Sequence, residues 1–481
     1  MNPMRLAVVG DRWRTVADAW RRPHEQRSLN QRVMVSSLLS TTEFGIEGVT
    51  RLVSTVILTR LLSPEDFGAF AVVLFVLYLL VMVTDLGIRS LVLTHDGTVN
   101  ADFLRSCWTV QLIRGGLLSV AVVGIGLGLV GAQSAGWVAE GSAYADADLP
   151  WVICGASAVL LLQSGLSPKM YLYERDMRFV RLSAMRITLT VLGAALTIGL
   201  VWWLGSLWAL LFGQVAATAL QVAASFLLFR GPSMRLRLAP EATRAILERG
   251  RWIMGHSGLT AATELADRVM FSLFLGAAEF GQYHIAKQIL SLFAGLANSV
   301  TGRFGLQYFT QLQATFDPAG VSREYYRYRL AFDAFLAITA GALFALAPLI
   351  VGILYDDRYA DVAPVLQLLA LGLPLIGTGF IRAAFSAQRR FRAMTFLGLI
   401  QTGSIWLGLV VALPVLGSPL LALFVVALHR LPELAVLLWK ARREGWIRFR
   451  HEARVIPLFT LGVGLAWIAE TAWVVIGIPL P

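Results

Sequence analysis

Charge is the scarcest property of this chain. Charged residues make up 15% of the 481 residues, whereas hydrophobic residues make up 57%. The polar segments between the apolar runs are short, about 30 residues at most, so no separate soluble domain fits between them. Apolar runs of about 18 residues or more recur along nearly the whole length, and each is long enough to cross roughly 30 Å of hydrocarbon. The composition therefore indicates a polytopic membrane protein.

Motifs for catalysis and for cofactors are also missing. The two cysteines, Cys107 and Cys154, lie inside or at the ends of apolar runs and imply no disulfide framework. No Cys/His cluster has the spacing of a zinc site, and no P-loop or nucleophile–base pattern is present. We therefore expect no metal, no cofactor, no catalytic residue and no enzyme activity. Any energy coupling is expected to use an ion gradient or substrate supply rather than bound ATP.

The distribution of basic residues predicts the topology. The apolar runs predict thirteen spans, at about 34–60, 67–88, 105–130, 149–171, 179–203, 206–229, 251–276, 279–303, 329–354, 361–385, 393–414, 418–439 and 455–478. With a cytoplasmic N-terminus, the inner segments hold 33 of the 41 Lys and Arg, and the outer segments hold only Arg60 and Arg358. This bias follows the positive-inside rule. The net charge of +11 thus reflects membrane topology rather than nucleic-acid binding.

An internal repeat divides the chain into two halves. The segment Leu62–Phe70, where span 1 leads into span 2, is echoed by Gly276–Tyr283, where span 7 leads into span 8. Phe67-Gly68 aligns with Phe280-Gly281 at an offset of 213 (280 − 67). Six spans separate the two copies, so the halves have the same orientation. We predict an all-α polytopic membrane protein: two parallel six-helix lobes around a central cavity plus an extra C-terminal helix, with 12–14 transmembrane helices in all. The predicted parts are a basic cytoplasmic tail (1–32), the first lobe (33–230), a cytoplasmic linker with a short amphipathic helix (231–250), the second lobe (251–440), and a basic segment with the terminal helix (441–481).

Basic side chains inside the predicted spans give the best clue to function. They are Arg51, Arg114, Arg186, Arg268, Lys287 and Arg430. One such charge at the centre of a membrane helix costs roughly 2.5–3.5 kcal/mol on insertion scales. We therefore expect these side chains to face a water-filled cavity or to pair with carboxylates. An excess of cations favours a transporter for an anionic substrate.

Four short segments have a loose sequence pattern whose order and spacing along the chain are informative. They are Leu61–Gly68, Asp85–Gly87, Leu275–Ala286 and Ile353–Ala370. With these segments the chain resembles the Wzx-type polysaccharide flippases of the multidrug/oligosaccharidyl-lipid/polysaccharide exporter superfamily, over roughly residues 35–440. The resemblance implies a two-lobed helical transporter of the bacterial inner membrane. It would move undecaprenyl-diphosphate-linked oligosaccharides by alternating access for surface polysaccharide, lipopolysaccharide or exopolysaccharide synthesis. Its expected partners are that lipid-linked substrate, membrane lipids, and a polysaccharide polymerase with the export machinery.

Span 1 carries Glu43, Glu47 and Arg51 at i, i+4 and i+8, which places them on one helical face. In the resembled family, the first helix of each half borders the central cavity. Two interpretations remain open. Arg51 contacts a substrate diphosphate while Glu47 exchanges a proton or compensates charge, or Glu47 and Arg51 form a structural ion pair within the helix.

Spans 7 and 8 add two further cations, Arg268 and Lys287, to the predicted diphosphate site, because Arg gives bidentate oxyanion contacts and Lys a mobile point charge. Glu264 and Asp267 are expected to couple an ion or to compensate charge. The alternative is a self-contained Glu264–Arg268 pair on one helix. Outside the site, Arg114 and Arg186 are expected to snorkel to the inner interface. Asp333 is expected to pair with Arg329.

Other functions compete with this prediction. A lipid II flippase has the same general pattern, whereas a multidrug cation antiporter of the same superfamily needs a cavity dominated by carboxylates. A polysaccharide polymerase or ligase needs a substantial outer loop, and the longest predicted here, 131–148, holds about 18 residues without Arg or His. A non-transporting partner in a glycan export complex is the fourth alternative.

Overall fold

The computed structural model describes residues 29–95, 97–139, 141–300, 318–377, 379, 381–382, 391–443, 452 and 454–475. Over these residues every regular element is a helix, so the predicted all-α class is confirmed. The predicted basic tail lies, up to residue 28, outside the described residues. The described chain divides into two compact units. Unit 1 holds residues 29–54, 83–126 and 152–257, and unit 2 holds residues 55–82, 127–151 and 258 onward.

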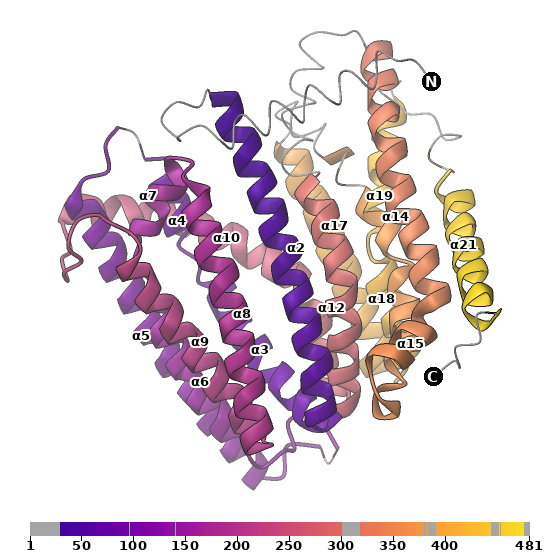
Figure 1. Ribbon diagram of the computed structural model, residues 1–481, viewed down its shortest axis with the longest axis horizontal. Helices are drawn as coiled ribbons and strands as arrows, with labels where there is room; N and C mark the ends of the chain where they lie inside the picture. Colours follow the sequence, from indigo (N-terminus) through magenta and orange to yellow (C-terminus); the bar gives the residue numbers. More distant parts are fainter. Residues whose placement is uncertain are drawn as a thin grey trace. The chain divides into compact units, whose positions relative to one another are not determined.

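The helices follow the predicted spans closely, and each of the thirteen predicted spans overlaps at least one of them (Figure 1). The α-helices up to the middle of the chain are α2 (Leu29–Leu61), α3 (Pro64–Val83), α4 (Ile88–Leu93), α5 (Ala101–Ser134), α6 (Leu149–Ser164), α7 (Lys169–Arg175), α8 (Phe179–Leu204), α9 (Leu207–Leu227), α10 (Pro240–Glu264), α11 (Ala266–Phe274) and α12 (Ala277–Val300). The later elements are α14 (Pro318–Leu354), η3 (Asp357–Tyr359), α15 (Val362–Ala370), η4 (Leu373–Gly377), α17 (Phe391–Val410), the π-helical η5 (Val411–Val415), α18 (Pro419–Leu428), α19 (Leu431–Arg443) and α21 (Val455–Val475).

Length and composition identify seven described helices or helix runs as able to cross a membrane, or eight if α6 and α7 form one span bent by 56°. The chain is thus a multi-pass membrane protein. Helices α2 and α12 fall outside that group although they match predicted spans 1 and 8. Both carry charged side chains at the predicted membrane depth, Glu43 and Arg51 on α2 and Lys287 on α12, and these lower the apolar character of the helix.

In unit 1, α8 and α9 pack closely as an antiparallel pair. A Cβ at Gly213 would lie 2.4 Å from the Thr197 hydroxyl oxygen, and one at Gly193 would lie 2.9 Å from the Ala217 Cβ. Small residues at such contacts let two membrane helices approach closely, and dispersion contacts then hold them together. A second cluster joins α4, α7 and the start of α5 to α10, around Leu104 and Ile246.

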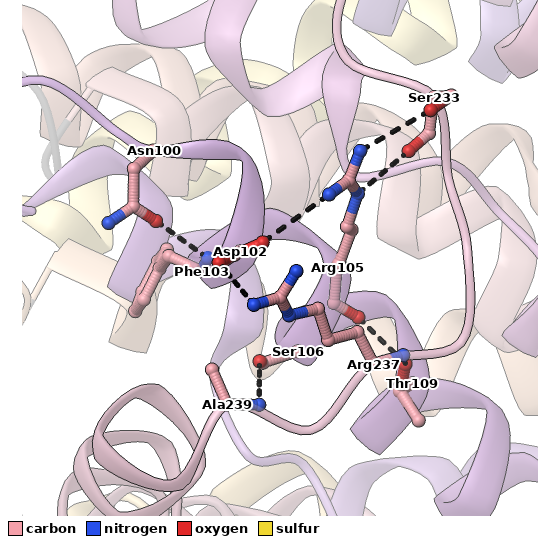
Figure 2. Close-up of polar contacts among 9 residues, drawn as sticks. All are labelled: Asn100, Asp102, Phe103, Arg105, Ser106, Thr109, Ser233, Arg237 and Ala239. Carbon is pink, nitrogen blue, oxygen red and sulfur yellow. Dashed lines mark hydrogen bonds and ion pairs between the residues drawn. The ribbon is translucent and has the colours of Figure 1, made fainter.

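A non-helical segment, residues 228–239, connects α9 to α10 in unit 1; we call it the strap. It lies against the first turns of α5 (Figure 2). The backbone N–H of Arg237 donates to the Thr109 hydroxyl and that of Ala239 to the Ser106 hydroxyl, each at 3.0 Å. Arg105 donates to the Ser233 carbonyl at 3.0 Å. Helix α10 then runs without interruption from Pro240 to Glu264, so the predicted surface helix and the first half of the predicted seventh span form one continuous helix.

In unit 2, α21 packs along α14, and the two helices lie side by side in Figure 1. A Cβ at Gly341 would lie 2.2 Å from the Phe459 carbonyl oxygen, and one at Gly462 would lie 2.3 Å from the Ile338 carbonyl oxygen. Within α14, Arg329 pairs with Asp333 at 3.0 Å, which confirms that predicted pair, and it also contacts Glu452 at 2.8 Å. The terminal helix is therefore integrated into unit 2.

The two copies of the repeated Phe-Gly motif contact one another in unit 2. Each glycine lies in the first turns of its helix, Gly68 on α3 and Gly281 on α12. A Cβ at Gly68 would lie 1.7 Å from the Ala277 carbonyl oxygen, and one at Gly281 would lie 2.9 Å from the Pro64 carbonyl oxygen. The contact is reciprocal and runs backbone to backbone. The motif therefore recurs because the two helices cross where no side chain fits.

This crossing predicts the effect of enlarging either glycine. Gly68→Val forces α3 away from α12, because the obstructing atom is a backbone oxygen that cannot rotate aside. Overpacking of this kind costs about 1–3 kcal/mol. We expect the thermal unfolding midpoint of the detergent-solubilised protein to fall by several degrees, and Gly281→Val to do the same. Gly124→Val on α5 is the matched control, since nothing lies within 4 Å of its Cβ position. Equal midpoints for the Gly68 and Gly124 variants would contradict the crossing.

Candidate functional site

A break between two helices of unit 2 creates the setting of the candidate site. Helix α10 ends at Glu264, Leu265 interrupts it, and α11 begins at Ala266. Asp267 therefore lies in the first turn of a new helix, where the dipole of the peptide groups favours a negative charge. Its Oδ1 accepts a hydrogen bond from the backbone N–H of Arg268 at 2.8 Å. The break thus stabilises a carboxylate that is 1% exposed.

Two side chains of α12 complete the surroundings of Asp267. The Tyr283 hydroxyl donates to Oδ2, and the Lys287 ammonium lies 2.5 Å from the same oxygen. Tyr283 and Lys287 are one turn apart on α12, so both reach one acceptor. Tyr283 is 2% exposed and packs edge-on against Phe271, with 4.5 Å between ring centroids. The Lys287 side chain remains 31% exposed, so the ion pair is buried on its acidic side and accessible on its basic side.

Arg268 lies beside this pair but makes different contacts. Its guanidinium carbon is 5.8 Å from the centre of the Tyr78 ring on α3, a cation–π contact. Glu264 is exposed, and in the described part of the chain it forms no ion pair with Arg268. The physical reason is the break at Leu265, since the i, i+4 geometry of a helix pair does not continue across it. The structure therefore gives no support to the self-contained Glu264–Arg268 pair.

In unit 1, the first residue of the predicted acidic stripe has a partner on another helix. Glu43 is 6% exposed; its Oε1 lies 2.9 Å from a terminal nitrogen of Arg186, and its Oε2 accepts from the Ser183 hydroxyl at 2.5 Å. Arg186 thus pairs within the bundle, and the expectation that it snorkels is wrong. Glu47 is half-buried one turn further along α2, and Arg51 is exposed one turn beyond that.

Of the six predicted site residues, the structure brings three together in unit 2: Asp267, Arg268 and Lys287. Glu264 belongs to the same unit, whereas Glu47 and Arg51 belong to unit 1. Sequence reasoning missed Tyr283, whose signal was its place one turn before Lys287. It also missed the partner of Arg114, whose Nε donates to the Thr84 hydroxyl at 3.0 Å.

The arrangement around Lys287 allows its ammonium to pair with a bound anion in place of the Asp267 carboxylate. Asp267 keeps a backbone N–H, the Tyr283 hydroxyl and the first turn of α11 as partners when Lys287 leaves. Lys287 is therefore available to a stronger anion that reaches its exposed side. A diphosphate carries more charge than a carboxylate and accepts more hydrogen bonds, and Arg268 adjoins the pair to share it.

Comparisons with known proteins agree with the fold. A family model described as polysaccharide biosynthesis protein matches residues 57–364. No curated protein matches the chain. The lipid II flippase MurJ, in an inward closed conformation, is 13% identical with a TM-score of 0.66, covering 91% of this chain and 93% of MurJ. The resemblance expected from the sequence motifs is thus confirmed.

Two MATE transporters are similar as well. A multidrug resistance MATE family transporter of the MOP superfamily, in an inward-facing conformation, is 14% identical with a TM-score of 0.53, covering 86% of this chain and 95% of the transporter. The eukaryotic MATE transporter AtDTX14 is 13% identical with a TM-score of 0.57, covering 90% of this chain and 99% of AtDTX14. At these identities, the similarities show the fold that the chain shares with these transporters.

The Asp267–Lys287 pair predicts a non-additive mutational response. Lys287→Met leaves a buried carboxylate without its cation, and removing one partner of a buried pair costs about 3–5 kcal/mol. Asp267→Asn combined with Lys287→Met removes both charges, so we expect the double variant to recover part of the lost thermal stability. The measurement is a double-mutant cycle of unfolding midpoints in detergent. Strictly additive losses would contradict the coupling.

Proposed function

Since the chain belongs to the polysaccharide biosynthesis protein family, we propose that it is a flippase for polyprenyl-diphosphate-linked oligosaccharides. The bearer lipid would be undecaprenyl diphosphate, and the membrane would be the inner membrane of a bacterium, with the N-terminus in the cytoplasm. The translocated repeat units would supply surface polysaccharide, lipopolysaccharide or exopolysaccharide synthesis. A polymerase and export machinery would receive them on the outer side.

One observation carries this proposal, the half-exposed Lys287 paired with the buried Asp267 beside Arg268. Asp267 pairs with the same cation, Lys287, that a substrate diphosphate would contact. An arriving diphosphate displaces the carboxylate from Lys287, and the tyrosine and backbone donors retain Asp267. The cost of freeing the cation is therefore offset by partners already in place. Protonation of Asp267 would release Lys287 in the same way, which gives Asp267 a role in ion coupling or charge compensation.

The remaining predicted residues take matching roles in this proposal. Arg51, which is exposed on α2 of unit 1, is the third proposed substrate contact. Glu47 and Glu264 compensate charge or carry a coupling ion. A MATE-like cation antiporter is disfavoured, because a cationic drug would be repelled by Arg268 and Lys287. A lipid II flippase uses the same diphosphate chemistry, so the experiment below separates it by the lipid that accumulates.

We expect Arg268→Ala and Lys287→Ala to block flipping beyond any loss of folded protein, whose amount is measured for each variant because Lys287→Ala also removes the partner of buried Asp267. In a strain that lacks the gene, each variant should leave at least about tenfold more complete lipid-linked oligosaccharide on the inner leaflet than wild type, since losing 1.4 kcal/mol of binding already weakens it tenfold. The measurement is the fraction that a glycosidase added outside spheroplasts does not cleave, quantified by mass spectrometry. Arg249→Gln, an exposed arginine on α10, is the control and should behave as wild type.

The outcomes separate the alternatives. Accumulation of lipid II instead of an oligosaccharide precursor would identify a lipid II flippase. Intact glycan synthesis without any accumulated lipid-linked saccharide in the deletion strain would overturn the flippase proposal. Normal flipping by well-expressed Arg268→Ala and Lys287→Ala proteins would remove these residues from the substrate site.

A further inference from the structure

A buried lysine of unit 1 has no role in the proposed transport site. Lys169 is the first residue of α7, directly after the bend between α6 and α7, and it is 9% exposed. Its ammonium lies 5.8 Å from the centre of the Phe226 ring. Among the described residues it has no carboxylate partner, although a lysine side chain packed this deeply usually has one. This cation is therefore placed for an anion that does not belong to the described chain.

Two arginines belong to or contact the start of the strap: Arg230 is part of it, and Arg181 of α8 donates to it. A Cβ at Gly231 would lie 3.3 Å from Cγ of Lys169, so the strap passes directly over the lysine side chain. The backbone N–H of the preceding Arg230 donates to the Tyr173 hydroxyl at 3.2 Å. Arg181 donates to the Leu228 carbonyl at 3.3 Å. Within the part of the chain that the structure describes, neither arginine forms an ion pair with a carboxylate.

The strap is held in position at both ends. Its first residues are anchored by Phe229, which is 1% exposed and packs edge-on against Tyr173 with 4.9 Å between ring centroids. Its last residues are tied to α5 by the contacts that Figure 2 shows, including the Arg237–Asp102 ion pair at 3.0 Å. Lys169, Arg181 and Arg230, which we call the Lys169 cluster, thus lie on or against a fixed stretch of the fold.

Nearby acidic groups do not neutralise this cluster. Glu174 on α7 is 5% exposed at its side chain and is committed to Arg89 of α4. Asp176, in the turn after α7, is exposed. Large apolar side chains lie exposed beside the cations instead: Leu227 at 82%, Leu228 at 43% and Val180 at 48%. Fixed cations bordered by exposed apolar side chains match the boundary between lipid headgroups and acyl chains.

We propose that Lys169, Arg181 and Arg230 form a binding site for the headgroup phosphate of an anionic phospholipid, with its acyl chains along Leu227, Leu228 and Val180. Basic pockets between membrane helices bind such headgroups. The phosphate provides the counter-charge that buried Lys169 lacks, and the arginines add oriented donors. The site lies at the end of α9 that the charge distribution predicts to be cytoplasmic. It does not rest on the proposed transport activity.

The test uses the purified full-length protein in phosphatidylcholine nanodiscs that contain a small fraction of phosphatidylglycerol. Native mass spectrometry counts the phosphatidylglycerol molecules that each protein retains and gives their affinity. We expect Lys169→Met to weaken this binding about fivefold, because each cation near an anionic lipid surface contributes about 1 kcal/mol of attraction. Lys169→Arg should retain it. The double variant Arg181→Gln/Arg230→Gln alters exposed side chains only. It should weaken phosphatidylglycerol binding more than Lys169→Met does, without unfolding the protein. Arg249→Gln is the matched control.

Several results would overturn the proposal. One is equal retention of phosphatidylglycerol by wild type, Lys169→Met and the double arginine variant. Another is equal retention of phosphatidylcholine and phosphatidylglycerol by wild type. Displacement of bound phosphatidylglycerol by millimolar inorganic phosphate would identify a site for a soluble anion instead. We expect the Lys169→Met and double arginine variants to lose phosphatidylglycerol, and wild type and Arg249→Gln to retain it. We also expect inorganic phosphate not to displace the lipid from wild type.

Discussion

The high cost of an unpaired charge away from water is the constraint on which the rest of this structure depends. In the described chain, two buried carboxylates have specific partners that reduce this cost. Asp267 is held by Lys287 and Tyr283, and Glu43 by Arg186 and Ser183. Such pairs are poor sources of stability, because desolvation offsets most of their attraction. Their retention in a membrane protein is more readily explained by a function that needs charges at that depth.

Helix packing supplies the framework for these charges. Water does not drive helices together inside a bilayer, so close backbone contacts at small residues take over that role. The crossing of α3 and α12 at Gly68 and Gly281, and that of α14 and α21 at Gly341 and Gly462, are of this kind. The first crossing fixes the start of α12, and that helix then presents Tyr283 and Lys287 to Asp267 within the same unit.

Lys287 and Lys169 illustrate two ways in which the fold holds a lysine inside a helix bundle. Lys287 has an internal anion that can be exchanged, and this suits a site that must bind and release its ligand. Lys169 has no carboxylate partner in the described chain, which suits a ligand that stays. The distinction follows from whether the fold provides a competing carboxylate. The presence or absence of that carboxylate therefore distinguishes the proposed transport role of Lys287 from the proposed lipid-binding role of Lys169.

The sequence by itself determined the all-helical membrane class and the positions of the long apolar helices, because hydropathy and helix period are local properties. It also identified the Phe-Gly repeat and the Arg329–Asp333 pair, whose members lie one turn apart on α14. Only the tertiary structure decided which other charges meet. Glu43 pairs with Arg186 on another helix, and the break at Leu265 separates Glu264 from Arg268. Such pairings depend on the rotation and contact of whole helices, which residue spacing along one chain does not encode.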